Sequence, residues 1–251
     1  MTLNGLSDGT GVLALPFVAP PKRLGVAVVE SLVDLIVSGV LQPGDTVPPE
    51  LPLSEQFGVS RTVVRESVKR LEEKGLVSVG QGRGTVIQPT TNWNMLDSVV
   101  LASLIAHDRN FGILDELTIV RAELESAMAR QTAAAVSGDA LDPLRNALEL
   151  MRSTILDVPR FLEADVVFHE TVMRASGNRL AENITHTLYR RARESERYAR
   201  VDVPASFHDL TLKEHQLVYD AIVAGDGEAA ATHMYSHIVD SWQRRRPTCG
   251  G

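Results

Sequence analysis

The apolar residues along most of this chain recur at the spacing of amphipathic helices. Between residues 24 and 40, Val28, Leu32 and Ile36 fall on one helical face. After residue 95 the same period continues without a convincing strand signal, broken by short segments rich in Gly, Pro, Asp and Asn. Short connections between successive helices imply an antiparallel bundle. The pattern predicts about seven such helices, near residues 95–106, 113–136, 140–153, 159–175, 179–199, 210–224 and 227–245.

The stretch between residues 47 and 87 follows a different pattern. A short helix is expected at about 50–57, a tight turn at Gly58, and a second helix at about 61–74 with Ser60 as its N-cap. Apolar and polar residues then alternate on both sides of a glycine-rich tip, as in two short strands joined by a hairpin. This order predicts a winged helix-turn-helix, which places its second helix in the major groove of DNA.

These patterns give a mainly α fold with two folded domains. Composition changes after Pro89, where the strand signal ends and the long helical patterns begin. We therefore expect a disordered N-terminal tail at 1–21, a winged helix-turn-helix at 22–89 and an all-helical domain at 90–247.

Composition narrows the class of protein. The chain has 251 residues, 44% of them hydrophobic and 23% charged, as in soluble globular proteins. It has no apolar run long enough to cross a bilayer and no signal-peptide pattern. Cys249 is the single cysteine, which precludes an intrachain disulfide and favours a cytoplasmic location.

The charge distribution is compatible with DNA binding. The net charge of −7 argues against a protein that coats DNA non-specifically, but the first 90 residues are nearly neutral. Arg61, Arg65 and Lys69 recur every four residues on one stripe of the predicted second helix. Arginine can donate two hydrogen bonds to a guanine edge or clamp a phosphate. Three stacked cations would repel one another unless an anion lies along them; the alternative is a solvated face whose ion-pair partners are Glu66, Glu72 and Glu73.

A second group of residues suits a metal ion. Asp165 and His169 lie four residues apart on one helix, while His215 and His237 lie among apolar residues on two later helices. Three imidazoles and one carboxylate suit Zn²⁺, Ni²⁺ or a similar cation. The alternative is that these are hydrogen-bonded core histidines. The remaining histidines are predicted to be surface or capping residues: His107, His186, His208 and His233.

The winged stretch resembles a known family. The string P-x-E-x-x-L-S-x-x-F-G-V-S-R-x-x-V-R-E-S-x-x-x-L-E-x-x-G-L-V, followed by G-R-G-T, is similar to the GntR family of bacterial transcription regulators over about residues 24–88. One departure is Leu51, because relatives often carry a polar or basic DNA-contacting residue there. The resemblance implies operator contacts from the second helix and the wing tip. The predicted DNA-binding residues are Ser60, Arg61, Thr62, Arg65, Lys69, Gln81, Gly82 and Arg83.

The helical part resembles the effector domain of the FadR subfamily, of the FCD type. The matching strings are D-x-x-F-H, A-S-G-N, E-H-x-x-x-x-D-A-I-x-x-G-D and M-x-x-H-I. Metal-binding members of that subfamily use one aspartate and three histidines at these places. The resemblance therefore implies a divalent cation, Zn²⁺ before Ni²⁺, held by Asp165, His169, His215 and His237.

The same resemblance implies a small carboxylate effector beside the metal. Arg121 occupies the position of a pocket arginine that would pair with the effector carboxylate; the alternative is an exposed partner for Glu125. Asn178 is the second expected effector contact, or else a helix cap. The W-N-x-L-D string at Trp93 resembles members that respond to sugar acids, such as galactonate regulators.

The function expected from these features is regulation of transcription, not catalysis. We expect a ligand-responsive repressor that binds a palindromic operator as a homodimer, because one recognition helix reads too few base pairs. A carboxylate or sugar acid would shift its DNA-binding form. The alternatives are a metal-dependent hydrolase, for which no general base is placed by a motif although Glu170 lies beside His169, and a regulator whose metal is purely structural.

Overall fold

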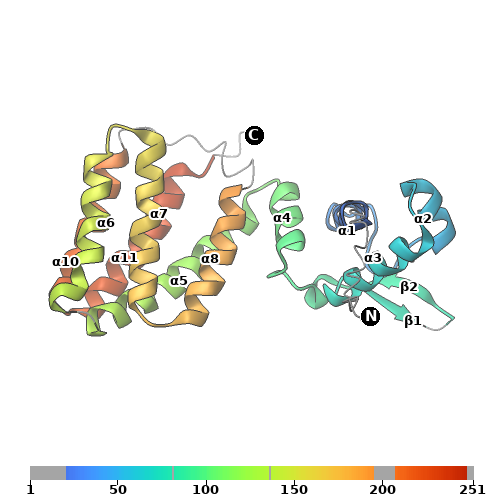
Figure 1. The fold of residues 1–251 in the computed structure, drawn as a ribbon, viewed down its shortest axis with the longest axis horizontal. Coiled ribbons are helices and arrows are strands. Elements are labelled where there is room, and N and C mark those ends of the chain that lie inside the picture. Colours follow the sequence, from blue (N-terminus) through green and yellow to red (C-terminus); the bar gives the residue numbers. More distant parts are fainter. Residues whose placement is uncertain (1–20, 81, 136, 195–206, 248–251) are drawn as a thin grey trace, which may run out of the picture.

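The computed structural model describes residues 21–80, 82–135, 137–194 and 207–247. It consists of a winged helix-turn-helix and a helical bundle, with one helix, α4 (Ser98–His107), between them (Figure 1). The predicted fold class is confirmed. The predicted tail, apart from its last residue, lies outside the described residues, as do Gln81, Cys249 and the last turn of the helix predicted at 179–199.

The winged helix-turn-helix is built from three helices and a hairpin. Its elements are α1 (Pro21–Val37), α2 (Glu50–Phe57), α3 (Arg61–Glu73), β1 (Val77–Gly80) and β2 (Gly84–Ile87). The turn between α2 and α3 forms as the sequence predicts. Gly58 takes the left-handed conformation with φ 62°, and the side chain of Ser60 accepts a hydrogen bond from the backbone N–H of Val63 at 3.3 Å. The strands pair antiparallel from Val77 opposite Ile87 to Gly80 opposite Gly84.

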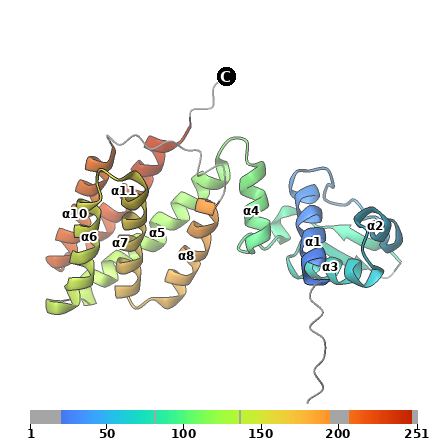
Figure 2. The same cartoon turned by 45° about the horizontal axis from the view of Figure 1, so that its top comes forward.

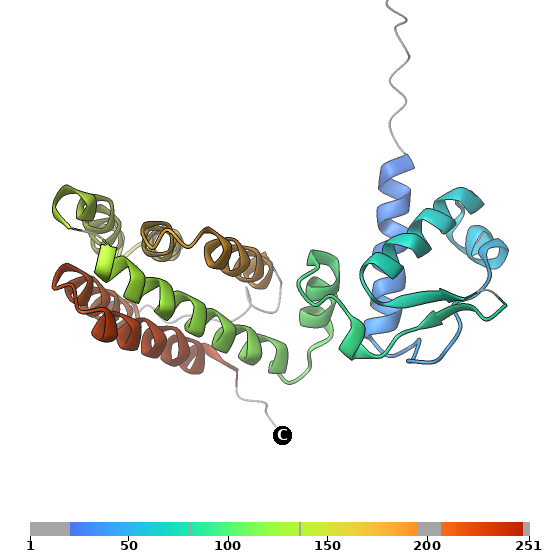
Figure 3. The same ribbon diagram turned by 90° about the horizontal axis from the view of Figure 1, so that it is seen from below.

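The bundle packs its helices side by side around an apolar core (Figures 2 and 3). The long helix α5 lies along α11, and α7 packs between α6 and α8. Each predicted helix is found within a few residues of its expected bounds. The bundle helices are α5 (Gly112–Ala135), α6 (Asp142–Ser153), α7 (Val158–Ala175), α8 (Arg179–Glu194), α10 (His208–Val223) and α11 (Gly227–Arg245). Among the described residues, no helix combines the length and the low polarity that a membrane crossing requires.

Helix α4 belongs to the cores of both parts. Val100 on α4 is buried in the core of the winged helix-turn-helix, whereas Leu101 and Ile105 pack in a separate cluster with Leu188 and Trp242 of the bundle. Two faces of one short helix thus touch the winged helix-turn-helix and the bundle. Figure 3 shows α4 in this position.

The end of α3 is tied directly to the start of α4. The ammonium group of Lys74 forms an ion pair with Asp97, the N-cap of α4, and both side chains are largely buried. The backbone N–H of Asn94 donates to the carbonyl of Lys74 at 2.9 Å. At Gly75, with φ 73°, a Cβ would lie 2.0 Å from the carbonyl oxygen of Asn92, so only glycine permits this close approach.

Candidate metal centre and DNA-reading helix

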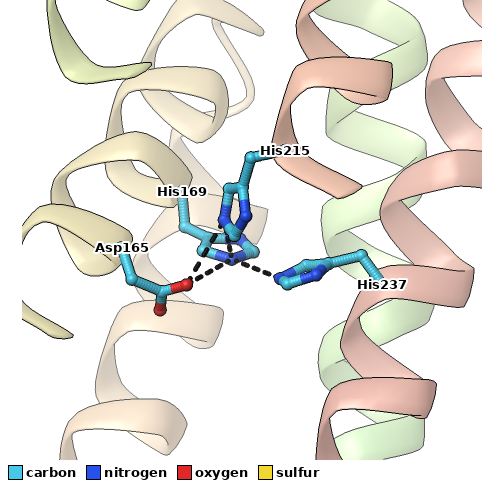
Figure 4. A group of neighbouring side chains, drawn as sticks. All are labelled: Asp165, His169, His215 and His237. Atoms are coloured by element: carbon cyan, nitrogen blue, oxygen red, sulfur yellow. Dashed lines mark hydrogen bonds and ion pairs between the residues drawn. The ribbon is translucent and has the colours of Figure 1, made fainter. Parts of the chain in front are cut away.

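Three helices bring the four predicted metal ligands together. Asp165 and His169 project from α7, His215 from α10 and His237 from α11, and one donor atom of each lies within 4.8 Å of the others (Figure 4). The three histidines are almost fully buried. Asp165 is partly exposed, with 17% of its side-chain surface accessible.

Three separations between donor atoms match those around a tetrahedral cation, and a fourth is wider. The Nε2 atom of His169 lies 3.2 Å from that of His237 and 3.3 Å from that of His215. The Oδ1 atom of Asp165 lies 3.3 Å from His215 Nε2 and 4.0 Å from His169 Nε2. For metal–nitrogen bonds of about 2.0–2.1 Å, tetrahedral geometry separates neighbouring donors by about 3.3 Å.

A neighbouring acceptor fixes the orientation of each imidazole. The Nδ1 atom of His169 contacts the carboxylate of Glu125 on α5, and that of His237 lies 2.8 Å from Glu214 on α10. His215 Nδ1 lies 2.8 Å from the carbonyl of Thr211. An imidazole that donates from Nδ1 carries its lone pair on Nε2, so three lone pairs and a carboxylate oxygen face one another. A cation would remove this repulsion, so the donor set fits a metal.

Electrostatics favour the neutral, metal-binding form of His215 and His237. Burial lowers the pKa of His215 to about 4, and burial together with the neighbouring imidazoles lowers the pKa of His237 well below its ordinary value. Burial alone would raise the pKa of Asp165, but its interactions with the imidazoles of His169 and His215 and with the Arg121 guanidinium outweigh burial, so the pKa falls overall. A metal binds neutral imidazole and ionised carboxylate, which are the forms favoured for His215, His237 and Asp165.

Arg121 lies beside this centre but is already paired. Its Nε atom donates to Glu125, its guanidinium stacks 3.8 Å from the ring centre of Tyr189, and only 8% of the residue is exposed. The predicted i, i+4 pair therefore exists, but it is buried rather than exposed. A cavity of about 20 Å³, lined in part by Arg121, Tyr189 and Arg245, opens next to it. That volume holds about one water molecule.

Asn178 lies at a different place. Its side chain accepts a hydrogen bond from the backbone N–H of Ala181 at 3.2 Å, as a cap of α8 does. It also lines a groove of about 750 Å³ with Leu96, Leu180 and Ile184. That groove and the small cavity at Arg121 share no lining residue.

The predicted DNA-binding residues that the structure describes are exposed. Thr62 and Lys69 on α3 are exposed, as are Gly82 and Arg83 at the hairpin, and Ser60 caps the helix. The side chains of Arg61 and Arg65 are 60% and 63% exposed, and both approach Glu50 at the start of α2. The alternative interpretation of the sequence offered Glu66, Glu72 and Glu73 as ion-pair partners of this stripe. In the structure, Arg61 and Arg65 pair with Glu50.

Comparisons with known proteins decide the family. The model described as "Bacterial regulatory proteins, gntR family" matches residues 24–87, and the FCD domain model matches residues 116–240. The chain is 30% identical over 209 residues to the galactonate operon transcriptional repressor of Escherichia coli (strain K12), covering 83% of this chain and 91% of the repressor. This chain belongs to the GntR family.

One further relative agrees with this membership, and one solved structure shares the fold. The HTH-type transcriptional regulator LutR of Bacillus subtilis (strain 168) is 30% identical over 210 residues, which cover 82% of this chain and 94% of LutR. The solved structure of Lar, which controls the expression of the Listeria monocytogenes agr system, has a TM-score of 0.52 at 20% identity, covering 90% of this chain and 99% of that chain. The GntR-family relatives are regulators of transcription, and the Lar likeness shows the fold.

Glu170, the acidic residue considered for the hydrolase alternative, pairs with a histidine outside the group of four proposed ligands. Glu170 lies 3.5 Å from the Nε2 atom of His186, whose side chain is half exposed. His208 also differs from its predicted surface or capping role. It is 1% exposed, and its ring stacks on Phe161 with centroids 4.4 Å apart.

The sequence reasoning did not predict the contacts that three acidic residues of this GntR-family chain make with histidine or arginine side chains. The carboxylates of Glu125 and Glu214 contact the Nδ1 atoms of His169 and His237. The carboxylate of Glu50 accepts a hydrogen bond from Arg65. A local signal existed only for Glu125, which lies four residues after Arg121, and for Glu214, which immediately precedes His215. For Glu50 the partner lies 15 residues away, so only the packing of α2 on α3 reveals it.

Proposed function

We propose that this chain is a ligand-responsive repressor of the FadR subfamily, which binds a palindromic operator as a homodimer in the cytoplasm. The observation that carries the proposal is the convergence of Asp165 and three histidines in the same chain as a winged helix-turn-helix. Such a chain would combine a sensor and a DNA reader without a separate signalling partner. Two recognition helices in one dimer would read two half-sites.

The metal is proposed to be Zn²⁺, with Ni²⁺ as the alternative, because three imidazole nitrogens and one carboxylate suit these ions. When bound, the ion would supply a positive centre that attracts a carboxylate oxygen of the effector. Asp165 and the three histidines would hold it, while Glu125 and Glu214 would keep two imidazoles in the binding orientation.

The effector is proposed to be a small carboxylate or sugar acid. Arg121 and Arg245 line the small cavity, which none of the four proposed ligands lines, and both contribute positive field at Asp165. A galactonate repressor among the relatives favours a sugar acid. The present cavity admits about one water molecule, so effector binding would require side chains around Arg121 to move. Asn178 remains a proposed second contact.

A thermal-shift screen tests this proposal directly. Purified protein, metal-loaded and chelated, would be melted with a panel of small carboxylates that includes galactonate. A ligand that binds the native form raises the unfolding free energy by RT ln(1 + [L]/Kd), about 2.7 kcal/mol at a hundredfold excess over Kd. We expect stabilisation only of the metal-loaded form. Equal stabilisation of the chelated form would contradict the metal-linked site. If the metal is purely structural, no carboxylate should change the melting temperature.

Helix α4 is the proposed relay between effector and DNA. Because Lys74 at the end of α3 pairs with Asp97 at the start of α4, a shift of α4 would move the DNA-reading helix. We predict that Lys74→Gln reduces the effect of the effector on operator affinity by roughly 0.5–2 kcal/mol. Operator titrations with and without effector measure this, with the exposed Lys213→Gln as the control. Unchanged coupling would place the relay elsewhere.

Arg65 is proposed to read the operator. We predict that Arg65→Ala weakens specific operator binding by roughly 1–3 kcal/mol, because the guanidinium offers two parallel hydrogen bonds to guanine. A mobility-shift titration measures the loss. Arg174→Ala, a matched change on helix α7 of the bundle, serves as the control. Operator affinity that is equal for the wild type and Arg65→Ala would refute this role.

A further inference from the structure

Glu50 lies where an acidic side chain should hinder DNA binding. It is the first residue of α2, and its carboxylate reaches two arginines of α3. Arg65 Nε donates to Glu50 Oε1 at 2.7 Å, and Arg61 Nη2 lies 3.6 Å from Glu50 Oε2. Exposed ion pairs of this kind add little to folding stability, so stability alone does not account for the arrangement.

The pair has a definite geometry. The hydrogen bond from Arg65 lowers the pKa of the Glu50 carboxyl below its ordinary value, so Glu50 is ionised at neutral pH. The bond uses the Nε atom of Arg65, at the inner edge of the guanidinium. The two terminal nitrogens then form the outer edge of a fork whose plane is fixed by Glu50. Leu53, buried in the core, anchors the turn of α2 that carries Glu50.

This geometry has opposite effects on two kinds of DNA binding. Holding the fork in one plane reduces the side-chain entropy that Arg65 loses when it contacts a guanine, so the affinity for DNA of the matching sequence rises. The negative charge of Glu50 offsets part of the local positive charge, so attraction to phosphates at any sequence is reduced. One carboxylate therefore strengthens specific binding and weakens non-specific binding.

We propose that Glu50 is a specificity-determining residue, which positions Arg65, and with it Arg61, for base recognition and suppresses binding to unrelated DNA. This inference rests on the proposed operator binding. It also accounts for the stripe of Arg61, Arg65 and Lys69: the anion that separates the first two cations in the free protein is Glu50, and not an acid of α3. Glu50 acts through the arginines and needs no base contact of its own.

The test compares Glu50→Gln with Glu55→Gln, which makes the same charge change at an exposed position of the same helix. Duplexes are first selected from a random pool with the full-length wild type. Dissociation constants are then measured for the selected duplex and for a scrambled duplex across a series of salt concentrations. We expect Glu50→Gln to bind the scrambled duplex roughly two- to fivefold more tightly and the selected duplex at least about fivefold more weakly.

A double-mutant cycle links the effect to Arg65. In the Arg65→Ala background, Glu50→Gln should still tighten non-specific binding but should no longer weaken selected binding. If Glu50→Gln and Glu55→Gln increase the affinity for both duplexes equally, Glu50 acts only through its net charge and the inference is overturned. Weaker binding to both duplexes, with a lower melting temperature, would show a structural role and overturn it as well.

The proposed function and this inference fail in different ways. A wild type that enriches no duplex from the pool would overturn operator binding itself. A wild type that enriches a duplex, with a Glu50→Gln variant that keeps the wild-type ratio of specific to non-specific affinity, would overturn only the role of Glu50.

Discussion

Removal of the metal is expected to lower the melting temperature by roughly 5–10 °C and to abolish the effector response. A cation that binds only the native state contributes about 2.7 kcal/mol at a hundredfold excess over its Kd. For a protein of this size, 1 kcal/mol corresponds to about 2–4 °C. Without the ion, the Nε2 atoms of His169, His215 and His237 again face one another without a shared positive centre.

The measurement combines elemental analysis with thermal melts of the same samples. Wild-type protein purified with added metal should contain one ion per chain, and chelation followed by metal addition should lower and then restore the melting temperature. His215→Ala should lose both the ion and the response to added metal. His186→Ala is the matched control, because that histidine is half exposed and outside the donor set. A His215→Ala variant that keeps one tightly held ion would refute the proposed ligands.

Helix positions, the turn between α2 and α3 and the shared face of Asp165 and His169 could be predicted because their signals depend on residues that are close in the sequence. One-sided burial produces the i, i+3, i+4 pattern of each helix, and Asp165 and His169 share a face through a spacing of four. Gly58 and Ser60 mark the turn between α2 and α3 by backbone and capping chemistry that depends on adjacent residues. For these features the sequence neighbours are also the spatial neighbours, whereas His215 and His237 meet His169 from 46 and 68 residues away and were expected there from the family resemblance.

The supporting acids could not be predicted in the same way. Glu125 and Glu214 lie on helices packed against the ligands, and which side chain meets which imidazole depends on helix rotation and crossing angle. The same holds for Glu50 and Arg65. Helix α4 was predicted as part of the bundle, yet two of its faces join two cores, because a periodic pattern does not say which partner covers each face.

Glu125→Gln is expected to cause the second large effect, a loss of about 3–5 kcal/mol in the free energy of unfolding. Glu125 is buried, accepts from Arg121 and contacts His169 Nδ1, and the charge of Arg121 together with the hydrogen bonds from both neighbours outweighs burial to lower its pKa to about 2. The amide would leave the Arg121 guanidinium without its anionic partner in the core. At about 2–4 °C per kcal/mol, the melting temperature should fall by roughly 10 °C.

The same substitution should weaken metal binding by about 10–100-fold, because His169 loses the carboxylate that orients it. Chemical denaturation and metal titration measure the two effects separately. Glu123→Gln, an exposed change on the same helix, is the control. Adding Arg121→Met to Glu125→Gln removes the buried charge that Glu125 neutralises, so it should recover part of the stability while metal affinity stays low. If metal affinity recovered together with stability, Glu125 would serve only to neutralise Arg121, and its role in orienting His169 would be wrong.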